Sequence, residues 1–504
     1  MQRRTGSVRR IWGLGFLAAA IAAWPAPTAA DVPWPTCAAK GCSDPADFAS
    51  YLFVAPGTLP DDYNPGSGEA WKYAPESGMD IIGVWEATTG RPDVVIAVID
   101  SGNFWDNRDL ARKVALNTGE LPVPAACSSH DCNGDGFVSV DDFAEACAAD
   151  LNGNGHCDGQ DLIRFYANGV DEDANGFVDD IAGWDFADDD NDADDEVRFG
   201  HGNGEASDEV AEANNGSGFP GFAPSAMYVP LKVADSFIGV DQEFARAVVY
   251  AVDLGVDVIS EALGTVNASA SGQAAVDYAY RRGIPLIASA ADEESRHHNY
   301  PAAYEHVIWV NSVTRGDGTF LDPNANGFDL LNGCTNYGGK AWVAIPSAAC
   351  SSEATSRAGG LTALLVSHGK NQIDRGAFSP YPGLATPFSA EEVRQLLRLS
   401  ARDVDYSTNP TVVMTGIADL VSDLLSARLL NLHFGTSRFP SQPGWDQFTG
   451  YGRPDGRPLL ALVTPTTIPP EADLAGGPTW FDTLDPVATP NVAIVGSARA
   501  VRRN

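Results

Sequence analysis

Long apolar runs and amphipathic segments alternate along the middle of this 504-residue chain. The first clear run, Val94 to Ile99, is apolar without interruption, is rich in β-branched residues, and ends on Asp100 and a turn. Such a run is typical of a central strand of a parallel sheet, in which both faces are covered. The pattern therefore predicts a strand that carries Asp100 at its carboxyl end.

Strand and helix patterns alternate regularly after Ala226. The predicted elements are a strand from Met227 to Val233, a helix from Asp241 to Leu254, a strand from Val256 to Ile259, a helix from Gly272 to Arg282 and a strand from Ile284 to Ala288. Strands that alternate with helices form parallel sheets with helices on both faces. The chain is therefore predicted to be an α/β protein with a central parallel sheet flanked by helices.

A buried helix is predicted within Ala349 to Gly369, where apolar residues recur at helical spacing. The Gly359–Gly360 pair in its middle is tolerated where another backbone packs very close. Ser352 lies in the first turn, beside unpaired N–H groups and the positive end of the helix dipole. That environment suits a serine whose attack creates an oxyanion, although serine is also a preferred N-cap residue.

His201 stands between two glycines, just before an Ala-rich segment that is predicted to be a second helix. Open α/β sheets place their active sites at the carboxyl ends of the strands. The order Asp100, His201, Ser352 along an α/β chain therefore predicts an acid, a base and a nucleophile that meet at this edge.

The motifs around these residues resemble those of the subtilisin-like serine proteases from about Asp80 to Gly452. Val98-Ile-Asp-Ser-Gly102 resembles the aspartate motif, Gly200-His-Gly202 the histidine motif, and Ser352-Glu-Ala-Thr355 followed by Gly360 the serine motif. The ordered set is much more specific than any one motif.

The resemblance implies a three-layer subtilisin-like fold and a serine endopeptidase that works through an acyl-enzyme. In that reading Asp100, His201 and Ser352 are the catalytic triad. Ala262, Leu263 and Gly264 look like the strand edge that hydrogen-bonds an extended protein or peptide substrate.

Three departures from the family pattern stand near these motifs. Gly204 replaces a second histidine, Glu353 replaces a methionine, and Asp292 takes the place of the oxyanion-hole asparagine. An ionised Asp292 would repel an oxyanion, whereas a protonated carboxyl group could donate a hydrogen bond to it. The alternative to an active enzyme is a catalytically impaired, calcium-stabilised binding module of the same fold.

The ends of the chain suggest an exported protein. Residues 1–30 have the basic, apolar and small-residue regions of a signal peptide, so a secreted or periplasmic location is expected. Its apolar run is shorter than the roughly 20 residues of a membrane span. Residues 31–79 form an N-terminal extension, residues 80–463 the predicted catalytic domain, and residues 464–504 a Pro-rich linker and tail.

The formal net charge is -35, which argues against nucleic acid as a partner, because phosphate binding needs clustered Lys and Arg. We expect a monomer that binds neither nucleic acid nor membrane.

Eight cysteines in an exported chain indicate disulfides. Their pairing is not readable from sequence; the preferred pair is Cys334 with Cys350, which would staple the loop that enters the Ser352 helix.

An insertion at residues 119–168 contains two loops with oxygen-bearing side chains at the alternate positions of an EF-hand-like site. The predicted Ca²⁺ ligands are Asp131, Asn133, Asp135, Ser139 and Asp142 in the first loop, and Asp150, Asn152, Asn154, Asp158 and Asp161 in the second. The loops are too close for two complete helix-loop-helix units, so a compact arrangement with shared helices is expected. Plain turns rich in Asx and Gly are the alternative.

Further elements are predicted towards the C-terminus. Ser389 opens a helix with a capping box, Asp419 to Leu432 forms a leucine-rich helix, and Asn491 to Ala500 is strand-like. A lone strand cannot bury its faces, so the tail either docks on the domain, lies disordered or is part of a longer protein.

Overall fold

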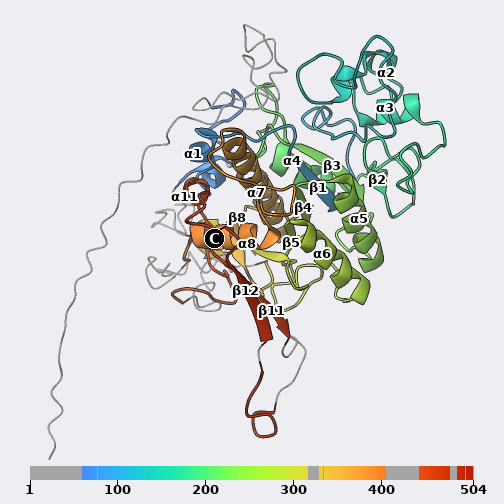
Figure 1. Cartoon of the computed structure of the whole chain (residues 1–504). Coiled ribbons are helices and arrows are strands. Elements are labelled where there is room, and N and C mark those ends of the chain that lie inside the picture. Colours follow the sequence, from blue (N-terminus) through green and yellow to red (C-terminus); the bar gives the residue numbers. More distant parts are fainter. Residues whose placement is uncertain are drawn as a thin grey trace, which may run out of the picture.

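The computed structural model describes residues 59–67, 69–75, 78–315, 329–332, 334–404, 442–476, 485–493 and 495–502. A central sheet crosses the molecule in the order β2-β3-β1-β4-β5-β6, with β7 and β8 both paired with β6 (Figure 1). Its strands are β1 (Val95–Asp100), β2 (Trp184–Asp185), β3 (Met227–Lys232), β4 (Val258–Glu261), β5 (Leu286–Ser289), β6 (Ile308–Arg315), β7 (Asp329–Leu331) and β8 (Val343–Pro346). Apart from β6 with β7, these strands pair in parallel, which confirms the predicted α/β class.

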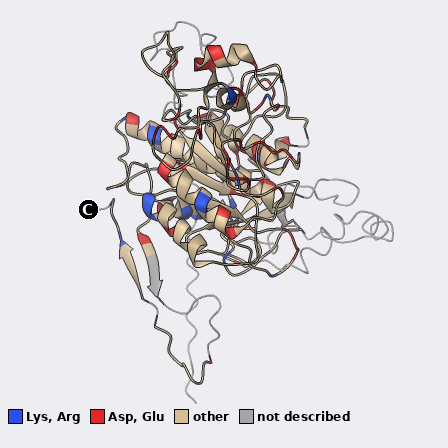
Figure 2. Ribbon diagram, turned by 90° about the vertical axis from the view of Figure 1, so that its right-hand side faces the viewer, with Lys and Arg blue, Asp and Glu red and all other residues tan. Residues whose placement is uncertain are grey.

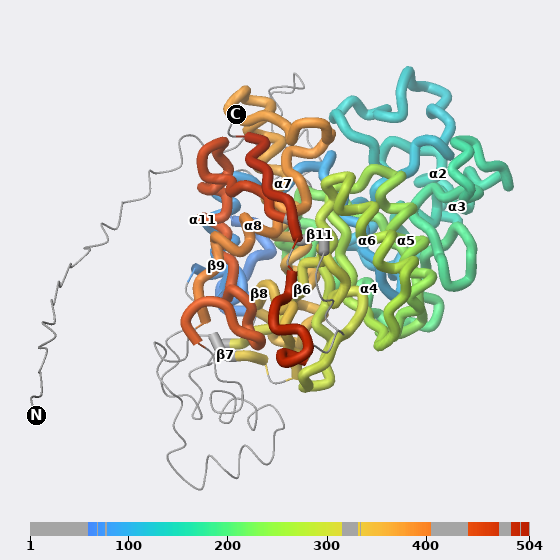
Figure 3. Tube along the Cα trace, turned by 60° about the horizontal axis from the view of Figure 1, so that its bottom comes forward, coloured from blue at the N-terminus to red at the C-terminus, as the bar shows by residue number. Residues whose placement is uncertain are grey.

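Helices cover both faces of the sheet because successive side chains of each strand point to opposite sides. On β1, Ile96 and Val98 pack in the core that contains α4 (His201–Val210) and α7 (Ser351–Asp374). Ala97 and Ile99 pack in the core of α5 (Asp241–Leu254) and α6 (Ala270–Arg282). The result is three layers, with α5 and α6 side by side on one flank in both Figure 1 and Figure 3.

Most predicted elements in the described residues are confirmed, with small shifts at their ends. The helix from Asp241 to Leu254 ends at Gly255, which has the left-handed conformation that glycine favours. The next helix begins two residues early, at Ala270, because the Ser269 side chain caps it by accepting a hydrogen bond from the N–H of Gly272. The signal peptide, Cys37, Cys42 and the helix predicted at residues 419–432 lie outside the described residues.

The tail contacts the domain through Glu471 and Arg502, whereas residues 495–499 between them are all exposed. Strands β11 (Glu471–Gly476) and β12 (Val495–Arg499) form an antiparallel ribbon that Figure 2 shows beside the body. Arg502 Nε lies 2.7 Å from Glu392 Oε1, near the start of α8 (Ala390–Ser400). The predicted capping box of α8 is present between Ser389 and Glu392. The strand-like run therefore finds its partner in the segment after the Pro-rich linker.

Smaller elements complete the domain. They are the short helices η3 (Ala70–Tyr73), α1 (Ile81–Trp85), η4 (Val140–Asp142), α2 (Ala144–Ala149), α3 (Gly159–Tyr166) and α11 (Gly456–Ala461), and the strand pair β9 (Ala401–Arg402) and β10 (Arg453–Pro454). The insertion holds only η4, α2 and α3, and disulfides join Cys127 to Cys132 and Cys147 to Cys157. Within the described residues we find no helix with the length and apolar character needed to cross a membrane.

A buried network of charges ties α7 to the rest of the molecule. Arg357 of α7 is buried, and its Nη2 lies 2.7 Å from Asp208 Oδ1 of α4 and 2.8 Å from Glu353 Oε1. Lys72 of η3 is buried too and pairs with the same oxygen of Glu353. Burial disfavours the charged carboxylate, but Arg357 and Lys72 outweigh it and hold the pKa of Glu353 at about 2.

We expect Glu353→Gln to lower the free energy of unfolding by about 3 kcal/mol, since it removes the carboxylate that two buried cations share. Lys72 then keeps only Glu69, and Arg357 keeps Asp208 and Glu69. Urea unfolding at neutral pH measures this loss. As the matched control, Glu305→Gln removes an acid whose side chain is 68% exposed beside Lys340, and should change stability by less than about 1 kcal/mol. Equal losses in the two variants would contradict the assignment.

The same contact predicts an acid-sensitive part of stability. The pKa of Glu353 is lower in the folded chain than its ordinary value of 4.5, so its stabilisation is present above that pH. This stabilisation is lost as pH falls toward 2. The loss of stability between pH 4.5 and pH 2 should therefore be smaller in Glu353→Gln than in the unchanged protein.

Candidate active site

Asp100 and His201 meet at the carboxyl edge of the sheet. Asp100 is the last residue of β1 and is buried, whereas His201 is the first residue of α4. His201 Nδ1 and Asp100 Oδ1 are 2.8 Å apart, and the same oxygen accepts a hydrogen bond from the N–H of Ser101. This contact fixes the ring orientation and leaves Nε2 facing the site.

The glycine after His201 has a packing reason. A Cβ atom on Gly202 would lie 2.5 Å from the carbonyl oxygen of Gly102, which follows β1. Only a residue without a side chain allows α4 to approach the end of β1 this closely. Gly204 has open space at its Cβ position, so the absence of a second histidine there leaves no packing defect.

Ser352 is the second residue of α7 and is brought to the same edge. The predicted Cys334–Cys350 disulfide is confirmed, and it fastens the loop immediately before this helix. Ser352 Oγ donates a hydrogen bond to the carbonyl oxygen of Ala262, just beyond β4, at 3.2 Å. Within the described residues no hydrogen bond joins Ser352 to His201.

Asp292 lies after β5 and contacts the residue next to Ser352. Its Oδ1 accepts hydrogen bonds from the N–H of Ser351 at 2.8 Å and from Ser351 Oγ at 2.6 Å. Its side chain is exposed, yet partial desolvation by surrounding protein atoms raises its pKa, and the Ser351 hydrogen bonds oppose that rise. The sequence analysis did not predict Ser351 as the partner of Asp292. Its position next to Ser352 was the one signal that could have pointed to it.

The predicted substrate edge is already paired within the chain. The N–H of Gly264 donates to the carbonyl of Phe237, and the N–H of Gly239 donates to the carbonyl of Gly264, at 3.2 and 3.1 Å. A Cβ atom on Gly264 would also clash with Asn299. Ala262 and Leu263 are buried beside it.

Two aromatic rings and a second carboxylate surround His201. Phe199 stacks on the imidazole with centroids 5.9 Å apart, Phe237 lies 6.5 Å away, and Glu205 Oε1 is 3.8 Å from His201 Nε2. Burial disfavours the charged ring, but Asp100 and then Glu205 outweigh it and raise the pKa of His201 to about 9. Sequence reasoning missed these residues; only Glu205 carried a signal, because it lies one helical turn from His201.

A family model described as the subtilase family matches residues 91–452. The chain belongs to the subtilase family. This confirms the resemblance that the ordered motifs predicted, and the parallel sheet flanked by helices agrees with it.

Several proteins are similar to this subtilase. The thermophilic serine proteinase of Bacillus sp. (strain AK1) is 34% identical over 203 residues, which cover 38% of this chain and 49% of that protein. Thermitase of Thermoactinomyces vulgaris is 32% identical over 200 residues, covering 38% and 69%. The crystal structure of fervidolysin from Fervidobacterium pennivorans aligns with a TM-score of 0.47 at 17% identity, covering 84% and 51%. The chain thus spans about half the length of the first relative.

The carboxylate of Glu353 points away from the predicted triad. Its Oε1 faces Lys72 and Arg357, and its Oε2 accepts hydrogen bonds from the hydroxyl of Ser347 and the N–H groups of Ala348 and Ala349. Glu353 therefore anchors the loop that leads into α7.

The two predicted Ca²⁺ loops share one pattern of internal hydrogen bonds. The twelfth-position carboxylates, Asp142 and Asp161, each accept from the N–H groups of the second and third loop residues. They also form capping boxes with Ser139 and Asp158. The first-position acids accept from glycine N–H groups in both loops, Asp131 from Gly134 and Gly136, and Asp150 from Gly155.

The middle positions of the loops differ in their contacts. Asn133 and Asp135 accept from backbone N–H groups two residues on, and burial followed by nearby acids raises the pKa of Asp135 to about 6. In the second loop, the side-chain amides of Asn152 and Asn154 donate to Asp158.

The structure also gathers acids that the predicted ligand set left out. Glu120, Asp173 and Asp180 place ligand atoms within 4.8 Å of one another, as do Glu120, Glu172 and Asp179. The run from Asp171 to Asp180 signals a carboxylate-rich loop, but Glu120 lies far earlier in the chain and carried no signal.

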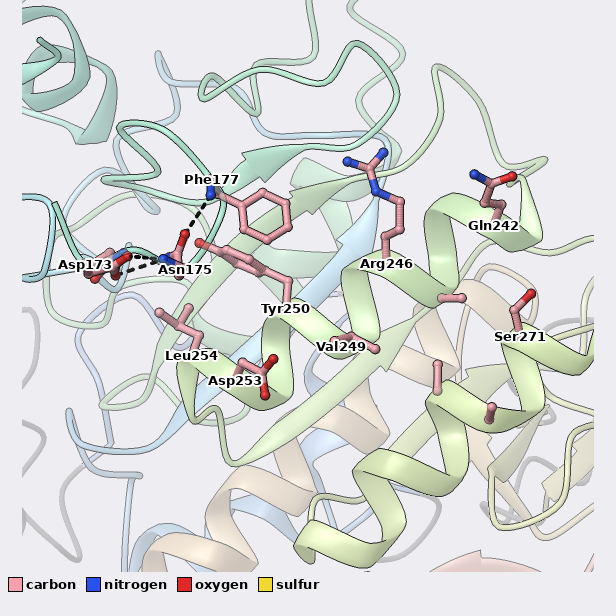
Figure 4. Close-up of a pocket in the computed structure, with 14 residues that line it drawn as sticks. Asp173, Asn175, Phe177, Gln242, Arg246, Val249, Tyr250, Asp253, Leu254 and Ser271 are labelled. Atoms are coloured by element: carbon pink, nitrogen blue, oxygen red, sulfur yellow. Dashed lines mark hydrogen bonds between the residues drawn. The ribbon is translucent and has the colours of Figure 1, made fainter. Parts of the chain in front are cut away.

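A cavity of about 840 Å³ lies beside this acidic group and against α5 and α6 (Figure 4). Tyr250, Val249 and Arg246 of α5 line it together with Asp173 and Phe177. None of the predicted triad residues lines it, so it is separate from the candidate active site.

We expect Gly202→Ala and Gly204→Ala to have opposite effects on stability. Gly202→Ala forces a collision with the backbone of Gly102 and should lower the free energy of unfolding by more than about 1 kcal/mol. Gly204→Ala adds a helix-favouring residue in open space and should raise it by about 0.5–1 kcal/mol. Urea unfolding compares the two. A harmless Gly202→Ala would disprove the tight approach of α4 to β1.

Proposed function

We propose that this subtilase is an exported serine endopeptidase that hydrolyses peptide bonds through Asp100, His201 and Ser352. The observation that carries the proposal is the 2.8 Å contact between His201 and Asp100, at the sheet edge where Ser352 lies in the first turn of α7. Family membership adds independent support, because the family model spans all three residues.

The chemistry follows from the positions of these atoms. Ser352 Oγ attacks the substrate carbonyl after a rotation about its side-chain bond releases the Ala262 carbonyl, since catalytic hydrogen bonds tighten when substrate is bound. His201 Nε2 takes the serine proton and returns it to the leaving amine, and Asp100 holds the tautomer with Nδ1 protonated. Water then hydrolyses the acyl-enzyme on Ser352.

The oxyanion is held by the backbone N–H of Ser352 and by a protonated Asp292. Desolvation supports the protonated form by raising the pKa of Asp292. Its Oδ1 accepts from Ser351, so Oδ2 is the oxygen that carries the donated proton.

An extended peptide substrate binds along Ala262, Leu263 and Gly264. For this to happen the segment from Phe237 to Gly239 gives up its two hydrogen bonds to Gly264, and the substrate replaces them. The exposed rings of Phe199 and Phe237 then lie beside the bound peptide.

An active-site-directed fluorophosphonate should label Ser352, and Ser352→Ala should abolish both labelling and turnover of a peptide substrate. Mass spectrometry of the labelled peptide identifies the site. Ser367→Ala is the matched control, because it removes a buried hydroxyl of the same helix that has no hydrogen-bond partner in the described structure. Absence of labelling at every pH tested, in folded protein, would favour the impaired binding module.

If Asp292 donates to the oxyanion, kcat/KM should fall as pH rises through its pKa, by up to about 100-fold, because the proton that it donates is lost. Asp292→Asn should remove this fall, since an amide donates at every pH. Glu293→Gln, which alters the exposed neighbouring acid, should keep it. A pH profile that Asp292→Asn leaves unchanged would refute the role.

We also propose that Ca²⁺ stabilises the insertion. Hard oxygen donors at alternate loop positions fit this ion, and the predicted ligands are Asp131, Asn133, Asp135, Ser139, Asp142, Asp150, Asn152, Asn154, Asp158 and Asp161. Burial, with a smaller contribution from nearby acids, raises the pKa of Asp135 and of Asp142, and a cation at the first loop would offset the cost of ionising them. Bound Ca²⁺ would neutralise these charges and hold the loops together.

Chelation by EGTA should lower the unfolding free energy by about 2–3 kcal/mol if the added Ca²⁺ exceeds its Kd about 100-fold. Asp131→Asn and Asp150→Asn, which change the first position of each loop, should reduce this chelator-sensitive part. Glu305→Gln should not. Thermal unfolding with and without EGTA measures the contribution of Ca²⁺ to stability. Stability that does not depend on Ca²⁺ would contradict this proposal.

Export is proposed from residues 1–30, whose pattern is that of a cleaved signal peptide, with the break after Ala30. The substrate would then be a protein or peptide outside the cytoplasm, and the protein is expected to act as a monomer.

A further inference from the structure

His201 lies between two carboxylates, one on each ring nitrogen. Asp100 Oδ1 is 2.8 Å from Nδ1, and Glu205 Oε1 is 3.8 Å from Nε2. Residues one helical turn apart share a face of α4, so the helix itself holds Glu205 beside the ring. Nε2 is the atom that must receive the proton of Ser352 in the proposed reaction.

Glu205 is poorly satisfied by other contacts. It is 7% exposed, and its Oε2 is buried without a hydrogen-bond partner in the described structure. Burial raises the pKa of Glu205 to about 8, and the His201 charge opposes the rise. A buried carboxyl group with a free oxygen gains most from a charged imidazole beside it.

The surroundings add further acids rather than a competing cation next to the ring. Four acids and one hydroxyl group face Glu205 or His201: Asp208 and Glu209 on α4, Asp100 on β1, Asp292 after β5, and the Ser356 hydroxyl on α7. One more acid, Glu261 at the end of β4, faces Asp100. Arg357 is held by Asp208, Glu353 and Glu69.

We propose that Glu205 is a positioning residue that draws the Nε2 side of His201 toward itself, keeps the ring protonated in the resting protein and sets the pH above which His201 becomes a free base. Ser352 bonds to Ala262 in this state, which agrees with a ring that has no acceptor to offer it. The inference rests on the proposed function only in naming His201 as the base; its test does not need activity.

Glu205→Gln keeps the shape of the side chain and removes its charge. An opposite charge within about 4–6 Å typically shifts a pKa by one unit or more, so the pKa of His201 should fall by at least about one unit. The pKa of His201 is raised above 6.5 in the folded protein, so the stabilisation by its charge is present below that pH and is lost as pH rises through about 9. The variant should lose the share of this stabilisation that Glu205 contributes, while the share of Asp100 remains.

Glu209→Gln is the matched control. Glu209 lies one turn further along α4 and is fully buried, with its carboxyl group in the space that Gly359 of α7 leaves free. Burial raises its pKa well above the ordinary value. The carboxyl groups whose charges act on the pKa of His201 are those of Asp100, Glu205 and Asp292, so replacing Glu209 leaves these charges in place. The His201 titration should not move.

The decisive measurement is an NMR titration of the imidazole resonances in the full-length protein, with His201 assigned by its loss in His201→Asn. A shift in Glu205→Gln but not in Glu209→Gln supports the inference. No shift, or equal shifts in both variants, overturns it. If Glu205→Gln does not fold, Glu205→Met fills the same space without a charge and is read in the same way.

Activity gives a second readout that separates the two proposals. In an active enzyme the acidic limb of kcat/KM should move to lower pH in Glu205→Gln by the same amount as the titration. A protein that titrates as expected but does not turn over substrate supports the role of Glu205 and counts against the proposed hydrolysis. An active enzyme whose acidic limb stays fixed overturns the role of Glu205 alone.

Discussion

The ion pair between the buried Arg357 and the partly buried Asp208 joins the two helices on which the site depends. Asp208 lies on α4, which begins at His201, and Arg357 lies on α7, which carries Ser352 in its first turn. Their 2.7 Å contact therefore sets how these helices lie against each other. Taking both charges out of water is costly, and the contacts of Arg357 with Glu353 and Glu69 offset that cost. The glycine pair in α7 completes the fit, since a Cβ atom on Gly359 would meet Glu209 and one on Gly360 would meet Phe222.

The interior beside this ion pair is unusually rich in carboxyl groups. Glu205, Glu209 and Glu261 are all buried near Asp100, and each has a carboxyl oxygen without a hydrogen-bond partner in the described structure. Burial, and after it the charge of nearby acids such as Asp100, raises the pKa of each. The charge of Asp100, and after it that of Glu205, favours a positive imidazole. The acid-base behaviour of His201 is therefore a property of the whole helix interface rather than of Asp100 alone.

Sequence patterns predicted local structure well wherever a short stretch of chain decides it. The helix from Asp241 to Leu254 has an apolar face and a glycine at its end, and both its bounds are confirmed. The capping box at Ser389 and the Cys334–Cys350 disulfide are also confirmed. The sequence showed only that Glu353 departs from the family pattern. The structure shows that its charge faces Lys72, a residue far earlier in the chain.

By itself, the sequence determined the family, the alternation of strands and helices, and the residues Asp100, His201 and Ser352 as candidates, because ordered motifs and apolar periodicity are properties of neighbouring residues. Only the tertiary structure decided that Nε2 of His201 faces Glu205, that Ser352 bonds to Ala262 and that Gly264 is paired with Phe237 and Gly239. These contacts depend on how the start of one helix meets the edge of a sheet. Distances of a few ångströms between separate elements are fixed by packing, and no local pattern records them.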